Sequence, residues 1–141
     1  MSIFLDTNIF VAFSNMKDKD HVRARTLLNR LRKGEFGTPF TSDYVFDEAV
    51  TVALFRTGRP DLAIKVGKLI LGAPEEGIPK LFMLVRVDNH NFSEAWEAFK
   101  RHKDGLLSFT DQTSLQIMKT YKIDSIMSFD SDFDGHVPRI C

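Results

Sequence analysis

The stretch Ser2-Ile3-Phe4-Leu5-Asp6 opens the chain with a short apolar run that stops at an acid. A run of this length and composition is typical of a strand that is buried on both faces. Asp6 therefore falls at the carboxyl end of the expected strand. In sheets of parallel strands, functional sites form outside the carboxyl ends of the strands. The opening stretch thus predicts a central strand and also an acid at the edge where a site would form.

Further strands and helices alternate along the rest of the chain. Strands are expected at 2–5, 38–40, 81–87, 125–129 and 137–140. Helices are expected at 9–13, 20–33, 42–56, 60–71, 93–101 and from Ser108 or Thr110 to about Tyr121. This alternation predicts an α/β fold around a mainly parallel sheet. The Gly- and Pro-rich stretch 72–79 is expected to be a loop inside a single domain, 1–141, because each side is too small for its own core.

Helical spacing also makes three specific predictions about packing and capping. Asn8 should cap the helix at 9–13. Phe55 should lie on the buried face of the 42–56 helix, and Trp96 and Phe99 should point inward from the 93–101 helix.

The composition excludes few functions. Lys+Arg and Asp+Glu number 19 each, so bulk charge does not predict a nucleic-acid binder, although a local basic rim around an acidic site stays possible. Cys141 is the single cysteine, which leaves no disulfide within the chain. An acid at position 6 interrupts any signal-peptide core, and no apolar run approaches a membrane span. We therefore expect a soluble, cytoplasmic protein with no membrane partner.

Four acidic residues occupy positions that are hard to explain as ordinary surface charge. Asp6 and Asp130 each follow an apolar strand, whereas Glu48 and Asp111 fall on or beside the buried faces of their helices. An unpaired carboxylate at an apolar seam costs several kcal/mol unless a cation compensates it. Two acids at strand ends and two acids on the core-facing sides of helices together predict a pocket lined by carboxylates.

Each acid taken alone has a simpler explanation. Asp6 can open a turn, Glu48 can pair with a buried Arg or Lys, Asp111 can complete the capping box of its helix, and Asp130 can belong to a hydrated turn. The pocket is favoured only when the four are counted together. Such a cluster would hold a hard divalent cation, and oxygen-only ligation suits Mg²⁺ or Mn²⁺ better than zinc.

In combination these residues resemble the PIN domain, and especially the VapC-like toxins of toxin–antitoxin pairs. The matching stretches are Phe4-Leu5-Asp6-Thr7-Asn8, Asp47-Glu48, Ser108-Phe109-Thr110-Asp111 and Ser128-Phe129-Asp130-Ser131-Asp132-Phe133. The resemblance covers essentially the whole chain, and the order and spacing of the motifs agree throughout.

The resemblance implies an α/β/α sandwich and a Mg²⁺- or Mn²⁺-dependent ribonuclease. Carried over by position, the acidic quartet that would bind metal and act in catalysis is Asp6, Glu48, Asp111 and Asp130, with Asp132 as a frequent further ligand. Polar positions that would steady these acids are Asn8, Thr110 and Ser128. Two departures stand out: threonine is common in the family at Ser128, and alanine is frequent at Gln112.

The predicted reaction is hydrolysis of RNA phosphodiester bonds by metal-activated water. Basic side chains that would grip the RNA backbone are Arg56, Arg59, Lys65, Arg101 and Lys103. If the protein is a toxin, a cognate antitoxin should block the acidic pocket. A homodimer is also expected, because the apolar residues of the 60–71 helix exceed what one amphipathic face needs.

Three alternatives remain open at this stage. A housekeeping PIN nuclease of RNA processing would need the same acids, and a non-catalytic PIN-like module could bind proteins instead. A phosphatase with Asp6 as nucleophile is disfavoured, because the haloacid dehalogenase group places an aspartate where Asn8 stands. The RNA target, the choice between RNA and DNA and the number of metal ions are not decided by the sequence.

Overall fold

A five-stranded parallel sheet forms the centre of the computed structural model, which describes residues 1–102 and 105–141. Its strands are β1 (Ser2–Leu5), β2 (Thr38–Ser42), β3 (Met83–Val85), β4 (Ser125–Met127) and β5 (Arg139–Ile140), in the order β3-β2-β1-β4-β5. The most apolar strand, β1, takes the central place, where Ile3, Phe4 and Leu5 are fully buried. Every pairing in the sheet is parallel, so the carboxyl ends of β1 and β4 lie side by side.

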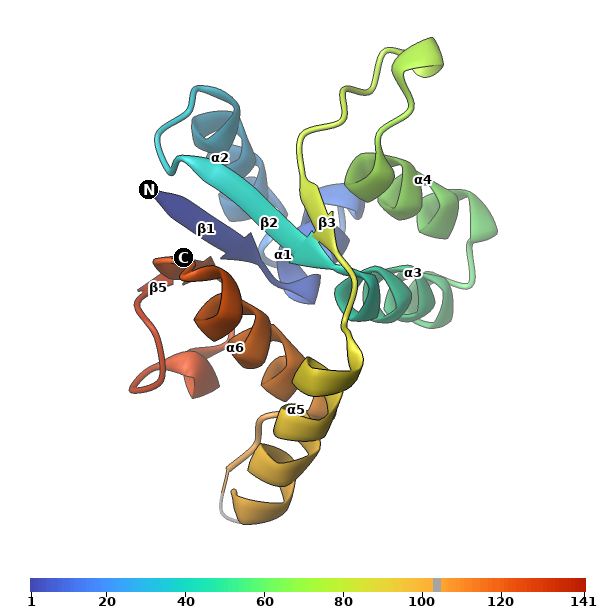
Figure 1. Cartoon of the computed structure of the whole chain (residues 1–141). Helices are drawn as coiled ribbons and strands as arrows, with labels where there is room; N and C mark the ends of the chain where they lie inside the picture. The colour runs from blue at the N-terminus through green and yellow to red at the C-terminus, as the bar shows by residue number, and fades with distance from the viewer. Residues whose placement is uncertain (103–104) are drawn as a thin grey trace.

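Six α-helices in the described residues surround the sheet (Figure 1). They are α1 (Thr7–Ser14), α2 (His21–Arg32), α3 (Asp43–Thr57), α4 (Pro60–Leu71), α5 (Asn89–Arg101) and α6 (Phe109–Tyr121). Two 3₁₀ turns, η1 (Pro74–Glu76) and η2 (Ser131–Phe133), interrupt the connecting loops. The helices pack in pairs, α1 with α2, α3 with α4 and α5 with α6, and α3 also contacts α1 and α6. Helix α3 therefore lies beside α1, which begins directly after the central strand β1, and beside α6.

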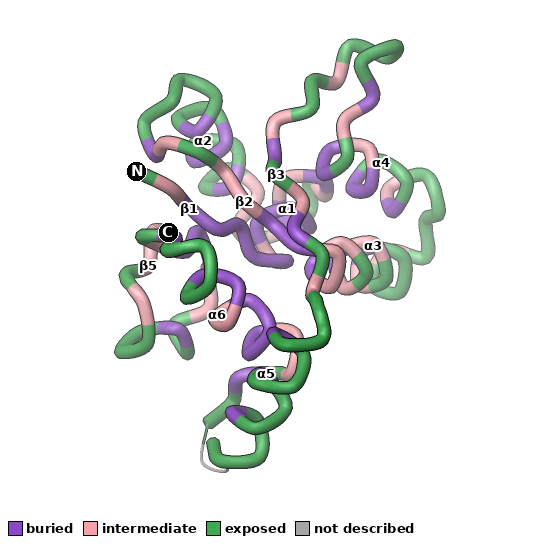
Figure 2. The backbone as a smooth tube through the Cα atoms, in the orientation of Figure 1, coloured by how far each residue is buried: buried purple, intermediate pink, exposed green. Residues whose placement is uncertain are grey.

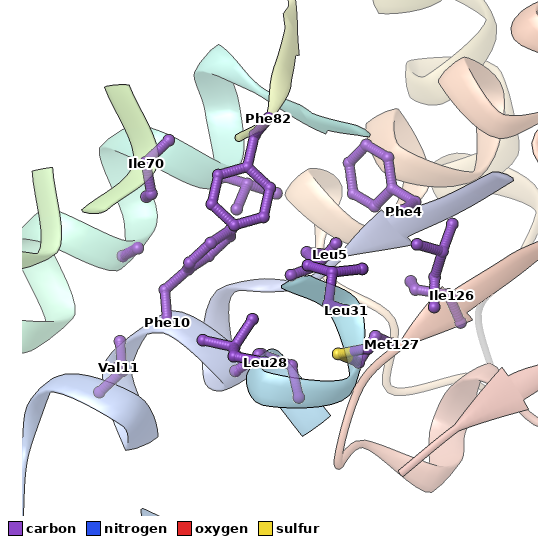
Figure 3. Close-up of a cluster of buried hydrophobic side chains, with 14 of the residues drawn as sticks. Phe4, Leu5, Phe10, Val11, Leu28, Leu31, Ile70, Phe82, Ile126 and Met127 are labelled. Atoms are coloured by element: carbon purple, nitrogen blue, oxygen red, sulfur yellow. The ribbon is translucent and has the colours of Figure 1, made fainter. Parts of the chain in front are cut away.

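The core lies between the sheet and the helices, and α1 to α4 and α6 all contribute buried apolar side chains to it. Figure 2 shows buried stretches of the tube on β1, at the end of β2 and on the inner turns of the helices. Ile126 and Met127 of β4 are fully buried as well. Phe10 and Phe82 meet edge to face, with ring centroids 5.2 Å apart, and Figure 3 shows this pair beside Leu28 and Ile70. Phe4, from the central strand, belongs to the same cluster. The core therefore fixes β1 rigidly, and with it the position of the residue that follows, Asp6.

The predicted class is confirmed: the chain folds as a single α/β domain around a parallel sheet. All five strands and six helices that the sequence predicts are present, and only their ends differ. Strand β3 is shorter than the predicted 81–87, and α5 begins at Asn89 rather than Ser93 because Asp88 caps it through the amide of Asn91. None of the described helices is both long and apolar enough to cross a bilayer.

Three sequence predictions about capping and packing are wrong. The cap of α1 is Asp6, whose carboxylate accepts from the Thr7 amide, so Asn8 lies inside the helix. Phe55 is 81% exposed, and Trp96 and Phe99 are 47% and 40% exposed. Helix α5 packs mainly on α6, at the edge of the molecule, so no third layer covers its aromatic side.

Candidate active site

The site begins at the carboxyl ends of the two central strands. Leu5 of β1 pairs with Met127 of β4, and the Asp6 amide continues the ladder by donating to the Met127 carbonyl at 3.1 Å. The next residues of each strand are therefore neighbours. This register brings Asp6 beside Ser128, although 122 positions separate them in the sequence.

A network of hydrogen bonds holds the Asp6 carboxylate. One oxygen, Oδ1, accepts from the Thr7 amide at 2.8 Å. The other, Oδ2, accepts from the Ser128 hydroxyl at 2.7 Å and from the Asn8 side-chain amide at 3.1 Å. Asp6 is only 4% exposed, so these bonds replace the water that a surface carboxylate would have.

The same network positions Asp130. The Asp130 amide donates to the Ser128 hydroxyl at 3.0 Å, and the Phe129 amide donates to Asn8 Oδ1 at 3.1 Å. Asn8 Nδ2 also donates to Ser128 Oγ at 3.2 Å. Asn8 and Ser128 thus tie the end of β1 to the loop that carries Asp130.

Helices α3 and α6 bring the other two acids. Ser108 caps α6 in a reciprocal capping box: its hydroxyl accepts from the Asp111 amide at 3.1 Å, and Asp111 Oδ2 accepts from the Ser108 amide at 2.8 Å. Ser42 caps α3 through the Val45 amide, and Glu48 follows one to two turns later on the same helix. Glu48 is half-buried and makes no hydrogen bond or ion pair in the part of the chain that is described.

All four acids line one small cavity of about 240 Å³, which we call the acid pocket. Its walls come from β1, α1, α3, α6 and the loop after β4. The lining residues are Asp6, Thr7, Asn8, Val11, Glu48, Val52, Arg56, Ser108, Asp111 and Asp130. Residues that lie far apart in the sequence therefore meet at the edge of the sheet where the topology predicts a site.

Burial and mutual repulsion disturb the two most buried acids. Desolvation raises the pKa of Asp6 to about 7, helped by the negative charges of Asp111 and Glu48 and opposed by the bonds from Ser128 and Thr7. Desolvation also raises the pKa of Asp111 to about 6, with Glu48 and Asp130 adding repulsion while Ser108 opposes the shift. The pocket thus concentrates negative charge that a bound cation would neutralise.

No basic side chain neutralises these acids among residues 1–102 and 105–141. Every ion pair there involves other acids, and Arg56, the one basic residue in the wall of the acid pocket, forms none. The described residues therefore give Glu48 no buried Arg or Lys partner, which was the simpler explanation for its position. In the same residues no three acidic, histidine or cysteine side chains already converge as ligands of one ion.

Several predicted site residues lie elsewhere. Asp132 is exposed and faces a different cavity, although its amide donates to Asp130 Oδ1 at 2.9 Å. The Thr110 hydroxyl makes no hydrogen bond to an acid in the described chain, and only its carbonyl is used, by Thr113 and Ser114. Gln112 is buried away from the acid pocket.

The predicted RNA-contacting residues fall into two groups. Arg56, Arg59 and Lys65 line one cavity beside the acid pocket, whereas Arg101 lines two cavities on the side of α5 and α6. Lys103 lies outside the described residues. Sequence reasoning missed Lys17, which joins the first group. The position of Lys17, just beyond the helix that carries Asn8, could have marked it as a candidate. The order of residues in the chain, however, does not show that Lys17 lies near α4.

The parallel sheet and the acid pocket at its carboxyl edge are together what a PIN domain is expected to have. Residues 3–136 match the family model described as PIN domain, and the chain belongs to this family.

Among characterised proteins, the chain is similar to a VapC ribonuclease of Archaeoglobus fulgidus, with 25% identity over 134 residues that cover 94% of this chain and 80% of the relative. The crystal structure of Mycobacterium tuberculosis VapC20, described as a sarcin–ricin loop cleaving toxin, matches with a TM-score of 0.77 and 27% identity over 93% of this chain and 92% of that one. The comparisons confirm the predicted family, the PIN domain, and the predicted similarity to VapC ribonucleases.

Two more distant structures share the fold. FitAcB of Neisseria gonorrhoeae has a TM-score of 0.66 at 16% identity, covering 99% of this chain and 96% of that chain. VapBC2 of Rickettsia felis, crystallised with a DNA fragment from its promoter, has a TM-score of 0.65 at 12% identity, covering 99% and 98%.

Proposed function

We propose that the chain hydrolyses RNA phosphodiester bonds as the toxin of a toxin–antitoxin pair, with Asp6, Glu48, Asp111 and Asp130 as its catalytic and metal-binding residues. The single observation that carries this proposal is the acid pocket, in which four carboxylates from separate elements line one cavity and none of them forms an ion pair in the described residues. Such an arrangement is unfavourable without a cation, because burial and repulsion both oppose charging the acids.

The donor set fits Mg²⁺ or Mn²⁺. Its anionic donors are all carboxylate oxygens, which hard divalent cations prefer, and its lining includes no histidine or cysteine of the kind that favours zinc. Since no three ligands already converge, we expect the half-buried Glu48 to turn toward the ion on binding. A bound ion of this kind lowers the pKa of water and stabilises a leaving oxygen during phosphodiester hydrolysis.

The protein's own groups would set the geometry of the reaction. Ser128 and Asn8 hold Asp6 in one orientation, and the capping box holds one oxygen of Asp111 while leaving the other available. Glu48 is the acid with the fewest constraints. With Asp6 and Asp111 held in place and Glu48 able to adjust, the four carboxylates could close around an ion without rearranging the backbone.

A cognate antitoxin and a homodimer complete the proposed function. The relatives include a toxin by description and a VapBC2 complex, which supports a protein partner for this chain. Ile64 and Leu71 of α4 are 56% and 46% exposed, which is consistent with an apolar surface that a partner covers.

The test compares two neighbouring acids of α3. Glu48→Gln removes a pocket carboxylate, and Asp47→Asn removes an exposed acid one position earlier that does not line the pocket. After removal of metal with EDTA, Mg²⁺ or Mn²⁺ should restore cleavage of single-stranded RNA by the wild type and by Asp47→Asn. Glu48→Gln should lose at least about a hundredfold in rate.

Circular dichroism should show that both variants stay folded. Metal-independent cleavage, or equal cleavage by Glu48→Gln and Asp47→Asn, would contradict the proposed mechanism. For the toxin role, induced expression of the wild type should arrest growth, and Glu48→Gln should not. Growth arrest by Glu48→Gln as strong as that by the wild type would mean that toxicity does not come from the acid pocket.

A further inference from the structure

A basic cavity lies directly beside the acid pocket. It has a volume of about 810 Å³ and forms where the ends of α1 and α3 meet the start of α4. We call it the basic groove and define it by six of its lining residues: Met16, Lys17, Arg56, Arg59, Leu62 and Lys65. No acid lines this cavity in the described part of the chain, although the chain as a whole carries equal numbers of acidic and basic residues.

Arg56 joins the basic groove to the acid pocket. On α3, Arg56 follows Glu48 by eight residues and Val52 by four, so the three side chains share one face of the helix. All three line the acid pocket, and Arg56 also lines the basic groove. The two cavities therefore share a wall, and a ligand that runs along this face of α3 would pass from one to the other.

The charges of the groove are largely available to a ligand. Arg59 is engaged by Asp61, with Nη2 and Oδ2 2.6 Å apart, so its charge is partly offset. Lys17, Arg56 and Lys65 form no ion pair within residues 1–102 and 105–141. Three cations gathered on one side of a metal site attract a polyanion rather than a neutral ligand.

The cavities around Arg101 lack these properties. They share no lining residue with the acid pocket, and the larger of the two is lined by Asp132 as well as by Arg101 and His102. An RNA strand held in the larger cavity would meet Asp132, and a strand held in either cavity would not continue into the acid pocket along a common wall. The structure thus separates the two groups of basic residues.

We propose that the basic groove binds the single-stranded RNA segment that flanks the scissile phosphate, and that Arg56 contacts the backbone where the strand enters the acid pocket. This inference rests on the proposed ribonuclease function. Lys17 and Lys65 pair with phosphates along the rim, and the exposed Met16, together with Leu62, offers apolar surface to a base. Mixed cationic and apolar walls match a nucleotide chain better than a simple anion.

The binding test uses Glu48→Gln protein in EDTA, so that the RNA stays intact, and a short fluorescein-labelled single-stranded RNA of mixed sequence. Adding Lys17→Glu and Lys65→Glu should weaken binding about tenfold and reduce the slope of log affinity against log salt by about 1.4. The matched control adds Lys33→Glu and Lys80→Glu, two exposed lysines that line none of the cavities described above and change the net charge equally. This control should bind within about twofold of its parent.

Cleavage separates binding from chemistry. In the otherwise wild-type protein, Lys17→Glu with Lys65→Glu should raise KM and leave kcat nearly unchanged, because neither lysine lines the acid pocket. If the charge reversals disturb folding, as judged by circular dichroism, the milder Lys17→Ala with Lys65→Ala serves instead.

The outcomes distinguish this inference from the function on which it rests. The same two pairs of charge reversals are compared for cleavage in the otherwise wild-type protein. Metal-dependent cleavage that is equally efficient with Lys17→Glu and Lys65→Glu as with Lys33→Glu and Lys80→Glu would overturn the proposed role of the basic groove and leave the proposed ribonuclease function intact. Absence of cleavage by the wild type would overturn the proposed function itself. If the groove variant binds RNA normally but loses an acidic peptide or protein partner, the groove is a protein-binding surface and the inference is wrong.

Discussion

At the scale of single residues, Ser128 is the point on which the geometry of the site depends. Its hydroxyl donates to Asp6 and accepts from the Asp130 amide and from Asn8, so one buried oxygen links both strand ends. Ser128→Ala leaves these partners unsatisfied, and we expect it to cost about 1–3 kcal/mol of stability and to weaken Mn²⁺ binding. Chemical denaturation and calorimetry measure the two effects.

Ser128→Thr provides the matched control for this prediction. Threonine is common at this position in PIN domains and keeps the hydroxyl, so the variant should retain most of the metal affinity and activity. Equal losses in both variants would mean that the space around Ser128, and not its hydrogen bonds, decides the effect.

Asp6 gives the metal-free protein an unusual dependence on pH. Its pKa in the folded state is about 7, above the ordinary 3.8, so folding favours the protonated acid. The stabilisation is complete below pH 4 and is lost as the pH rises through 7. Between pH 5 and 8 the free energy of unfolding in EDTA should fall by about 2–3 kcal/mol, with a smaller contribution of the same sign from Asp111.

Urea unfolding at several pH values, with and without Asp6→Asn, tests this sign. The substitution should flatten the dependence between pH 5 and 8. The carboxylates whose pKa is lowered, Asp61, Glu97 and Asp134, titrate below this window and should not mask the effect. Stability that rises with pH in EDTA would show that Asp6 is charged in the folded protein.

At the scale of elements, a tight turn sets how β2 starts beside β1. Gly37 has a φ of +74°, and a Cβ there would collide with the backbone carbonyl of Met1, the group that accepts from the Thr38 amide. Gly34 has a similar φ of +82° but open space around it. Both Ala variants carry the strain of a positive φ, about 1 kcal/mol, and only Gly37→Ala adds the clash.

We therefore expect Gly37→Ala to lower the melting temperature clearly more than Gly34→Ala. Because Gly37 lies at the amino edge of the sheet, the carboxyl edge with the acid pocket should keep its metal affinity in the folded fraction. Similar melting temperatures for the two variants would mean that the amino ends of β1 and β2 move apart easily enough to accommodate the added Cβ.

The elements also show what could be predicted from the sequence and what could not. The apolar run before Asp6 and the caps at Ser42 and Ser108 are local signals, and the structure keeps them. Phe55 and Trp96 were misplaced, because periodicity tells which residues share a helix face but not whether another layer covers that face. The same limit applies to the site, since the sequence indicated the acids but not the cavity that Arg56 shares with the basic groove.

At the scale of the whole molecule, the acid pocket connects elements that lie far apart in the sequence. Its walls come from the end of β1, from α3 and α6, and from the loop after β4, and α3 also packs against α6. A divalent ion held by acids from these elements would bind the folded protein and not the unfolded chain. By mass action it should stabilise the fold by about 2.7 kcal/mol at a concentration one hundred times its dissociation constant.

Thermal unfolding in EDTA and in Mn²⁺ measures this coupling directly. The wild type and Asp47→Asn should gain in melting temperature with Mn²⁺, and Glu48→Gln should gain much less, since it loses a ligand without disturbing the capping box or the strand-end network. In EDTA, Glu48→Gln should be at least as stable as the wild type, because it removes a charge that repels Asp6 and Asp111. That opposite response, more stable without metal and less responsive to it, is what a metal-binding carboxylate predicts. An acid that merely supports the fold would destabilise the protein under both conditions when it is replaced.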